Sequence, residues 1–163
     1  MKVAIIGGGP AGLAAVKHCL EQNIECTAFE QTENIGGTWI YTDNIEEDEN
    51  GVPVHTAMYQ GLRTTLPSRL MEFENFPHMS KENFYITQPD VLEYIKSYAN
   101  HFNLLPHIKV VFSFTKLFYG RPAKGVITKP RVSHLKKGKA FFRDGTEEDI
   151  DEVIYCTVIF HVK

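Results

Sequence analysis

A short apolar run at the N-terminus leads directly into a glycine-rich turn. The run, residues 2–6, is β-branched and apolar after its first lysine, as expected of a strand buried on both faces of a parallel sheet. The turn has the pattern G-x-G-x-x-G and consists of Gly7, Gly8, Gly9, Pro10, Ala11 and Gly12. Glycines at the three fixed positions allow a tight turn, close approach of the backbone to a pyrophosphate, and close packing of the next helix. The N-terminus therefore predicts a dinucleotide-binding βαβ unit.

Two further segments complete this unit. Residues 11–22 space their apolar side chains as a helix that covers a sheet, and residues 25–30 form a second strand. The strand ends at Glu30, eighteen positions after Gly12, where a carboxylate accepts hydrogen bonds from ribose hydroxyls and repels the 2′-phosphate of NADP. The sequence thus predicts FAD or NAD at this site and does not choose between them. An ordinary βαβ turn is the structural alternative.

A second glycine pair follows the strand. Gly36 and Gly37 offer a turn without side chains, where a backbone can approach a flavin or ribityl chain. Thr38 and Trp39 come next, and Trp39 is the only tryptophan of the chain. As a structural residue it anchors the core or its rim, and its indole N–H needs a partner.

Together with residues 59–67, 71–77 and 90–104, this pattern resembles the flavin-containing monooxygenases, including insect and plant members, over about residues 2–112. The resemblance implies a Rossmann-like α/β FAD-binding domain of the glutathione-reductase type, with an incomplete parallel sheet and a short β-hairpin segment. The FAD contacts that it implies are Gly7, Gly8, Gly9, Pro10, Ala11, Gly12, Glu30, Gly37, Thr38, Trp39 and Thr65.

The resemblance also implies a reaction. Family members use NADPH to reduce FAD and use O2 to oxygenate a soft nitrogen or sulfur nucleophile, with the flavin carrying the chemistry. Thr65 stands where the family commonly has an asparagine that faces the flavin, so it is the one candidate catalytic residue. As a structural residue, Thr65 is expected in a strand.

The domain organisation departs from the family pattern because the sequence holds one glycine fingerprint, whereas the family uses a second one for NADPH. We expect a single FAD-binding domain over 1–163, with an N-terminal portion (1–112), a junction loop (113–138) and a truncated returning portion (139–163). The family signature that precedes the second site begins at Phe118, but Lys124 and Thr128 do not match it, and Val158 replaces a family glycine. We therefore expect a short form with impaired activity.

Two other functions remain open. One is a non-catalytic FAD-binding remnant or interaction module, which associates with itself or with full-length chains through the exposed edge of its sheet. The other is an NAD-dependent oxidoreductase, although no catalytic His or Tyr-Lys pair follows the βαβ unit.

Residues after position 86 predict a further helix. Thr87 and Asp90 form a helix start, with Pro89 tolerated in the first turn. The residues that recur at helical spacing and are expected in the core are Val91, Ile95, Tyr98 and Phe102.

Composition excludes several classes. The net charge of -3 gives no electrostatic reason to expect nucleic-acid binding. The sequence has no uninterrupted apolar stretch of about 18 residues, so we expect no membrane-spanning helix. We therefore expect a cytoplasmic location. Cys19, Cys26 and Cys156 lack Cys-x-x-Cys spacing and are expected to be buried thiols, and the histidines lack ligand spacing, so no metal is expected.

Overall fold

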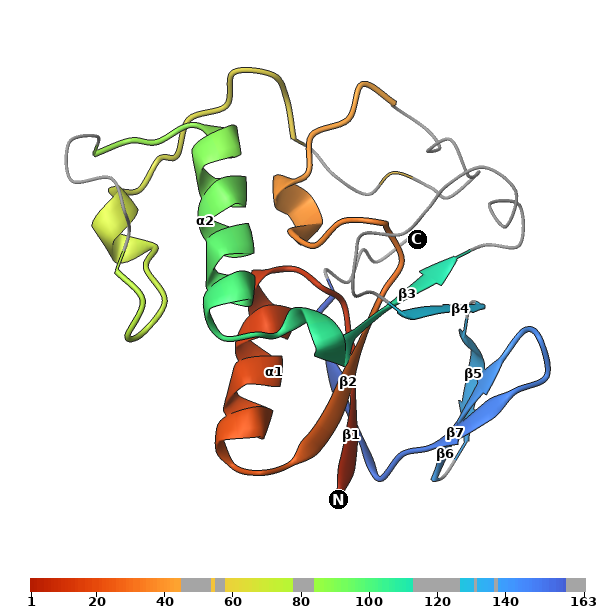
Figure 1. Ribbon diagram of the computed structural model, residues 1–163. Helices are drawn as coiled ribbons and strands as arrows, with labels where there is room; N and C mark the ends of the chain where they lie inside the picture. The colour runs from red at the N-terminus through yellow and green to blue at the C-terminus, as the bar shows by residue number, and fades with distance from the viewer. Residues whose placement is uncertain are drawn as a thin grey trace.

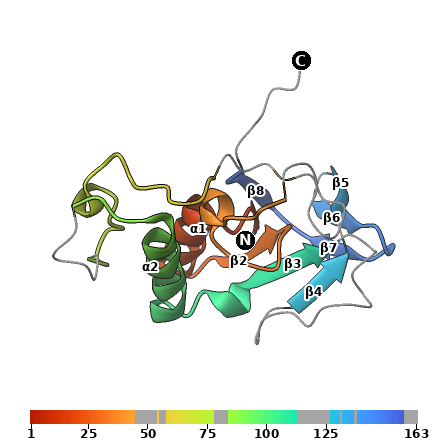
Figure 2. The ribbon, with the colours of Figure 1, turned by 90° about the horizontal axis from the view of Figure 1, so that it is seen from above.

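The central element of the fold is a five-stranded sheet with the strand order β4-β3-β2-β1-β8, in which every neighbouring pair is parallel (Figure 1; β8 is labelled in Figure 2). The computed structural model describes residues 1–44, 54, 58–77, 84–112, 127–130, 132–136 and 138–157. The strands are β1 (Lys2–Ile6), β2 (Glu25–Glu30), β3 (Ile108–Phe112), β4 (Ile127–Pro130) and β8 (Glu152–Tyr155). The expected parallel α/β sheet is confirmed.

Two helices, α1 (Pro10–Glu21) and α2 (Gln88–His101), lie on the same side of this sheet (Figure 2). Side chains alternate along a strand, so Val3 and Ile5 of β1 share one face and pack into the helix-side core. The fully buried side chains of this core include Ile5, Leu13, Val16, Ile95, Tyr98 and Ile108. Helical spacing predicted Val91, Ile95 and Tyr98 to lie in the core, and all three are buried in it. Phe102, predicted with them, is partly buried and packs against the edge of this core.

A smaller antiparallel sheet covers the opposite face. It has the order β5-β6-β7, formed by Val132–Lys136, Lys139–Phe142 and Glu147–Asp149. A second apolar cluster joins the two sheets and consists of Ala4, Phe29, Ala140, Phe142 and Ile150. The Lys109 ammonium of β3 also lies 2.8 Å from the Glu148 carboxylate of β7. The molecule thus has three layers, and the expected hairpin segment is confirmed.

The start of α2 follows the sequence prediction. The backbone N–H of Thr87 donates to the Asp90 carboxylate at 2.9 Å, and the Thr87 side chain caps the third residue of the helix in return. Pro89 lies in the first turn, where its missing N–H costs no helical hydrogen bond.

The junction differs from the expectation. Of the segment 113–138, the structure describes 127–130, 132–136 and 138, and these contain strands β4 and β5 rather than a loop. The β4 backbone pairs with β3, a partner that local composition does not reveal. Phe118, Lys124 and Val158 lie outside the described residues.

Remaining short elements are three 3-10 turns at Gly37–Trp39, Ser68–Leu70 and Leu105–His107. Within the described ranges, none of the helices has the length and hydropathy needed to cross a bilayer.

The thiols of Cys19 and Cys26 are buried and that of Cys156 is half-buried. Burial raises the pKa of the Cys26 thiol to about 12, which makes it unreactive at neutral pH.

Alkaline pH is expected to destabilise the fold through Tyr98. Burial raises the pKa of the Tyr98 phenol to about 12, whereas an exposed tyrosine ionises near pH 10. The folded state therefore holds the phenolic proton more tightly, and its contribution to stability, complete below about pH 10, is lost as the pH rises toward 12. Urea unfolding across this window should show a smaller alkaline loss for Tyr98→Phe than for the wild type. Tyr59→Phe, at an exposed tyrosine, is the control and should retain the wild-type slope.

Candidate dinucleotide site

The site begins where β1 passes into α1. Gly7 has a positive φ of 110°, and its N–H donates to the Phe29 carbonyl at 2.9 Å, which holds the turn against β2. Gly9 is the N-cap of α1, and within the described structure no side chain caps it and no acidic residue occupies the first turn. The positive end of the helix dipole is therefore left available for an anion.

Gly12 has a steric reason to be glycine. A Cβ atom at residue 12 would lie 1.9 Å from the carbonyl oxygen of Gly7, so no other residue fits without moving the turn. At Gly7 a Cβ atom would lie 2.9 Å from the carbonyl oxygen of Cys156. The helix and the chain after β8 therefore both pack directly on the turn.

A second glycine segment lies against the first. The Gly36 N–H donates to the Gly8 carbonyl at 3.1 Å, and Gly36 and Gly37 have positive φ values of 136° and 56°. A Cβ atom at Gly37 would lie 3.0 Å from the Cα atom of Gly9. Glycine at these positions therefore lets the two backbones lie directly against each other, and we call this pair of side-chain-free segments the glycine cradle.

Glu30 reaches the same turn from the end of β2. The Gly8 N–H donates to its carboxylate at 2.6 Å, and the Thr32 N–H and hydroxyl donate to its other oxygen at 2.8 and 3.0 Å. The Glu30 side chain is buried beside the turn. Sequence reasoning placed Glu30 here but missed Thr32, for which the only signal is a hydroxyl residue two positions after the acid.

The segment after β8 closes the back of the turn. β8 pairs in parallel with β1, and the Cys156 N–H donates to the Ile6 carbonyl at 2.9 Å. This brings residues 156 and 157, more than 140 positions away in sequence, against Gly7. Through this pairing β8, which lies within the expected returning portion (139–163), joins the sheet of the N-terminal portion.

The remaining predicted contacts lie around the cradle. Thr38 is exposed, whereas Trp39 is half-buried and packs against the helix-side core, as expected of a rim anchor. The Trp39 carbonyl accepts a hydrogen bond from the Gln88 amide of α2. Sequence reasoning missed Gln88, because this contact links two segments that lie far apart in sequence.

Thr65 lies in a bend with an exposed side chain, so its expected place in a strand is wrong. Its neighbour Thr64 is the buried member of the pair: the Thr64 N–H donates to the Ile86 carbonyl at 2.9 Å, and the Ile86 N–H donates to the Thr64 hydroxyl at 3.2 Å. Thr64 therefore holds the segment to the chain before α2, and this leaves Thr65 facing outward.

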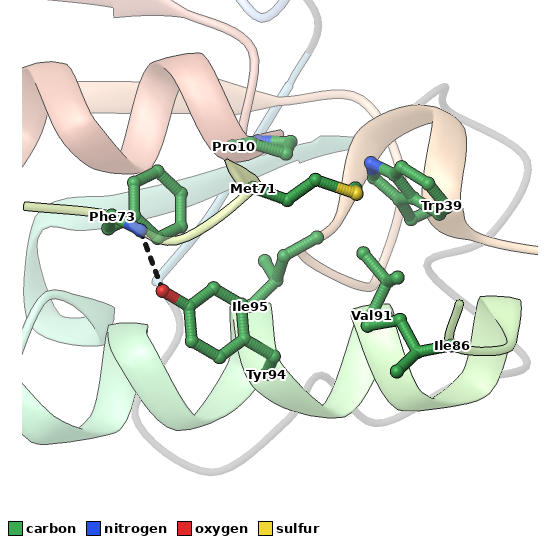
Figure 3. A pocket seen from close by; sticks show the side chains of 8 residues that line it. All are labelled: Pro10, Trp39, Met71, Phe73, Ile86, Val91, Tyr94 and Ile95. Carbon is green, nitrogen blue, oxygen red and sulfur yellow. Dashed lines mark hydrogen bonds between the residues drawn. The ribbon is translucent and has the colours of Figure 1, made fainter. Parts of the chain in front are cut away.

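An apolar pocket of about 120 Å³ adjoins these residues and was not predicted (Figure 3). We call it the Trp39 pocket; it is lined by Pro10, Trp39, Met71, Phe73, Ile86, Val91, Tyr94 and Ile95. Helical spacing predicted Val91 and Ile95 to be buried, but the position of the loop across from them depends on tertiary packing. In the described part of the chain, no three acidic, histidine or cysteine side chains form a metal-binding group.

The residues present fit a dinucleotide. An uncapped helix start suits a pyrophosphate, and the two glycine segments carry no side chains that would keep a ligand from the backbone. A buried carboxylate lies beside the turn, where it can accept ribose hydroxyls.

Comparisons with known proteins agree with this geometry. Residues 1–118 match a family model described as flavin-binding monooxygenase-like. Flavin-containing monooxygenase 1 of Homo sapiens is 36% identical over 108 residues, covering 66% of this chain and 19% of the human protein. Flavin-containing monooxygenase FMO GS-OX-like 4 of Arabidopsis thaliana is 31% identical over 167 residues, covering 94% of this chain and 36% of the plant protein.

A solved structure shares the fold. The flavin-containing monooxygenase from Stenotrophomonas maltophilia superimposes with a TM-score of 0.61 at 20% identity, covering 96% of this chain and 38% of that one. The fold and the glycine turn define a Rossmann-type dinucleotide-binding protein. More particularly, the chain belongs to the flavin-binding monooxygenase-like family. It spans between about a fifth and about a third of the length of the two curated relatives above.

Proposed function

We propose that this chain binds FAD at the glycine cradle and forms the flavin-binding portion of a monooxygenase. The observation that carries the proposal is the cradle itself, in which the Gly9 and Gly37 backbones meet at the uncapped start of α1. The family match supports a flavin rather than NAD, because the family is named for flavin binding.

The proposed FAD contacts divide by role. Backbone groups of the glycine turn hold the pyrophosphate, Glu30 accepts ribose hydroxyls, and the segment from Gly37 to Trp39 borders the rest of the cofactor. We include Thr65 because it is exposed, and Thr65→Asn would restore the amide that the resemblance implies. The full proposed set is Gly7, Gly8, Gly9, Pro10, Ala11, Gly12, Glu30, Gly37, Thr38, Trp39 and Thr65.

When bound, FAD would supply the chemistry that reduces O2 and transfers one oxygen atom to a soft nitrogen or sulfur nucleophile. The chain's own residues bind the cofactor and limit water: Trp39 and the apolar residues behind it lie on one side of the cradle. One fingerprint serves one dinucleotide, so these 163 residues by themselves are proposed to be poor at using NADPH. The proposed substrate is a small molecule with such a nucleophile. We also propose a cytoplasmic location, which cell fractionation would test.

The test is an absorbance spectrum of the purified and extensively washed protein, with Gly37→Val as the blocked variant. Co-purifying flavin in the wild type and none in the folded variant would support the proposal. A folded wild-type protein that remains colourless with added FAD would overturn it. Protection from thermal unfolding by NAD but not by FAD would instead favour the NAD-dependent alternative.

A second candidate function, self-association, is favoured by the edge strand β8. Among the described strands β8 pairs only with β1, and its Ile154 and Tyr155 side chains are 39% and 65% exposed. Natural sheet edges are often blocked by Lys or Pro, and the sequence of β8 contains neither.

The charge on β8 favours antiparallel pairing with a second copy. In a parallel pair the Glu152 carboxylates of two copies would lie side by side, whereas antiparallel pairing about the strand centre places each Glu152 opposite Tyr155. We propose that two chains join their sheets in this way.

Introducing a charge at this edge should separate the copies. We expect a concentration-dependent dimer in light scattering for the wild type and a monomer for Ile154→Lys, because a buried lysine would face the partner strand. Leu70→Lys, at a residue 73% exposed on the Ser68–Leu70 turn, is the matched control and should remain dimeric. A wild type that is monomeric at all concentrations, or equal dimerisation of both variants, would contradict the proposal.

A further inference from the structure

We propose that the Trp39 pocket is a binding site for dioxygen. The pocket lies between the N-terminal half of α2 and the segment that carries Met71 and Phe73, and its lining includes Pro10 and Trp39 (Figure 3). Those two residues belong to the two glycine segments of the proposed flavin site. The pocket therefore adjoins the cofactor site through its own wall, and the assignment of its ligand rests on the proposed function.

The pocket has a buried floor and a half-buried rim. The floor residues are between 2% and 6% exposed and are Ile86, Val91, Tyr94 and Ile95. The rim residues are half-buried and are Pro10, Trp39, Met71 and Phe73. A small ligand can thus reach the floor past the rim, without unfolding of the helix.

The lining favours an apolar occupant over water. Its floor has one polar side chain, Tyr94, whose hydroxyl accepts the Phe73 N–H at 2.7 Å and donates to the Phe76 carbonyl at 2.6 Å. A buried water needs two to four polar partners, and apolar cavities of comparable size in other proteins stay dry and bind xenon or benzene. With about 120 Å³ of space, the pocket suits a molecule of a few atoms.

Chemistry selects dioxygen among such molecules. Dioxygen is small and apolar, and it is the apolar reactant that the proposed function consumes. A second surface hollow, which Gln88 lines, offers a contrast, because Asn34, Glu93 and Lys96 also line it and suit water instead. An apolar pocket whose wall includes Pro10 and Trp39 would hold dioxygen beside the proposed cofactor site.

Trp39 makes the proposal directly testable. It is the only tryptophan and it lines the pocket, so quenching of its fluorescence by dissolved oxygen reports oxygen there. Acrylamide is polar and reports solvent access alone. Val91→Phe fills the pocket, Ile95→Val enlarges it, and Val153→Phe, on β8 outside the pocket, is the matched control.

We expect the oxygen quenching constant of the protein as purified to fall about twofold in Val91→Phe, to rise in Ile95→Val, and to stay unchanged in Val153→Phe. The acrylamide constant should not change in any of them. Equal oxygen quenching in all four folded proteins would overturn the proposal. If Val91→Phe fails to fold, the oxygen quenching constant of Ile95→Val tests the proposal alone. A constant that does not rise above the wild-type value would then overturn the proposal. Flavin absorbance is recorded separately, so failure of the pocket and failure of FAD binding are distinguishable.

Discussion

Replacing Gly12 by alanine is expected to destabilise the protein by about 3 kcal/mol or more and to abolish flavin binding. The added Cβ atom would lie 1.9 Å from the Gly7 carbonyl oxygen, and that oxygen belongs to backbone that cannot turn away alone. Relief requires α1 to move off β1. Such a movement would separate the start of α1 from Gly37 and open the cradle.

Chemical denaturation measures the change in free energy of unfolding, and flavin absorbance per chain measures binding. His18→Ala is the control, because residue 18 is an exposed position on the same helix and lies outside the proposed FAD contacts. It should retain flavin and lose little stability. A Gly12→Ala protein with wild-type stability and flavin content would show that the packing of α1 on the turn is not needed.

Local pattern was enough to predict the first half of the fold. β1 and β2 have the bounds expected from the sequence, and α1 begins one residue earlier than expected, at Pro10. The start of α2 was equally predictable, because the Thr87 and Asp90 side chains cap neighbouring backbone groups. In these segments local propensity, apolar periodicity and tertiary packing agree.

The junction was not predictable because its strands depend on distant partners. β4 ends at Pro130, and proline is unfavourable inside a sheet, but an edge position tolerates it. β5 is held by β6 across the turn at Gly138, which has a φ of 80°. A composition rich in Lys, Gly and Pro indicates a loop when these pairings are unknown.

The candidate site divides in the same way. Glycine spacing identified the turn, and the position of Glu30 after β2 identified the acid, because both follow from the geometry of a βαβ unit. The Trp39 pocket and the outward position of Thr65 depend on how residues 58–77 pack over α2, and no short-range pattern reports that packing.

Replacing Glu30 by alanine is expected to destabilise the protein by roughly 2 kcal/mol and to weaken flavin binding at least tenfold. The Glu30 carboxylate accepts the buried Gly8 N–H at 2.6 Å and the half-buried Thr32 N–H at 2.8 Å. Its removal leaves the Gly8 N–H without that acceptor in a buried place, whereas the Thr32 hydroxyl still has the Asn34 carbonyl at 2.8 Å. The turn would lose the contact that fixes Gly8, and a bound ribose would lose its acceptor.

Glu30→Gln separates charge from shape. Glutamine keeps one carbonyl oxygen but points an N–H₂ group at a donor, so we expect an intermediate loss of stability and of flavin affinity. Glu25→Gln is the matched control on the same strand, since Glu25 is exposed and pairs with Lys2 at the surface, at 3.3 Å. Its unfolding free energy and flavin titration should match those of the wild type. If all three variants bound flavin equally, the carboxylate at the end of β2 would hold the turn without contacting the ribose, and the dinucleotide would have to lie elsewhere along the cradle.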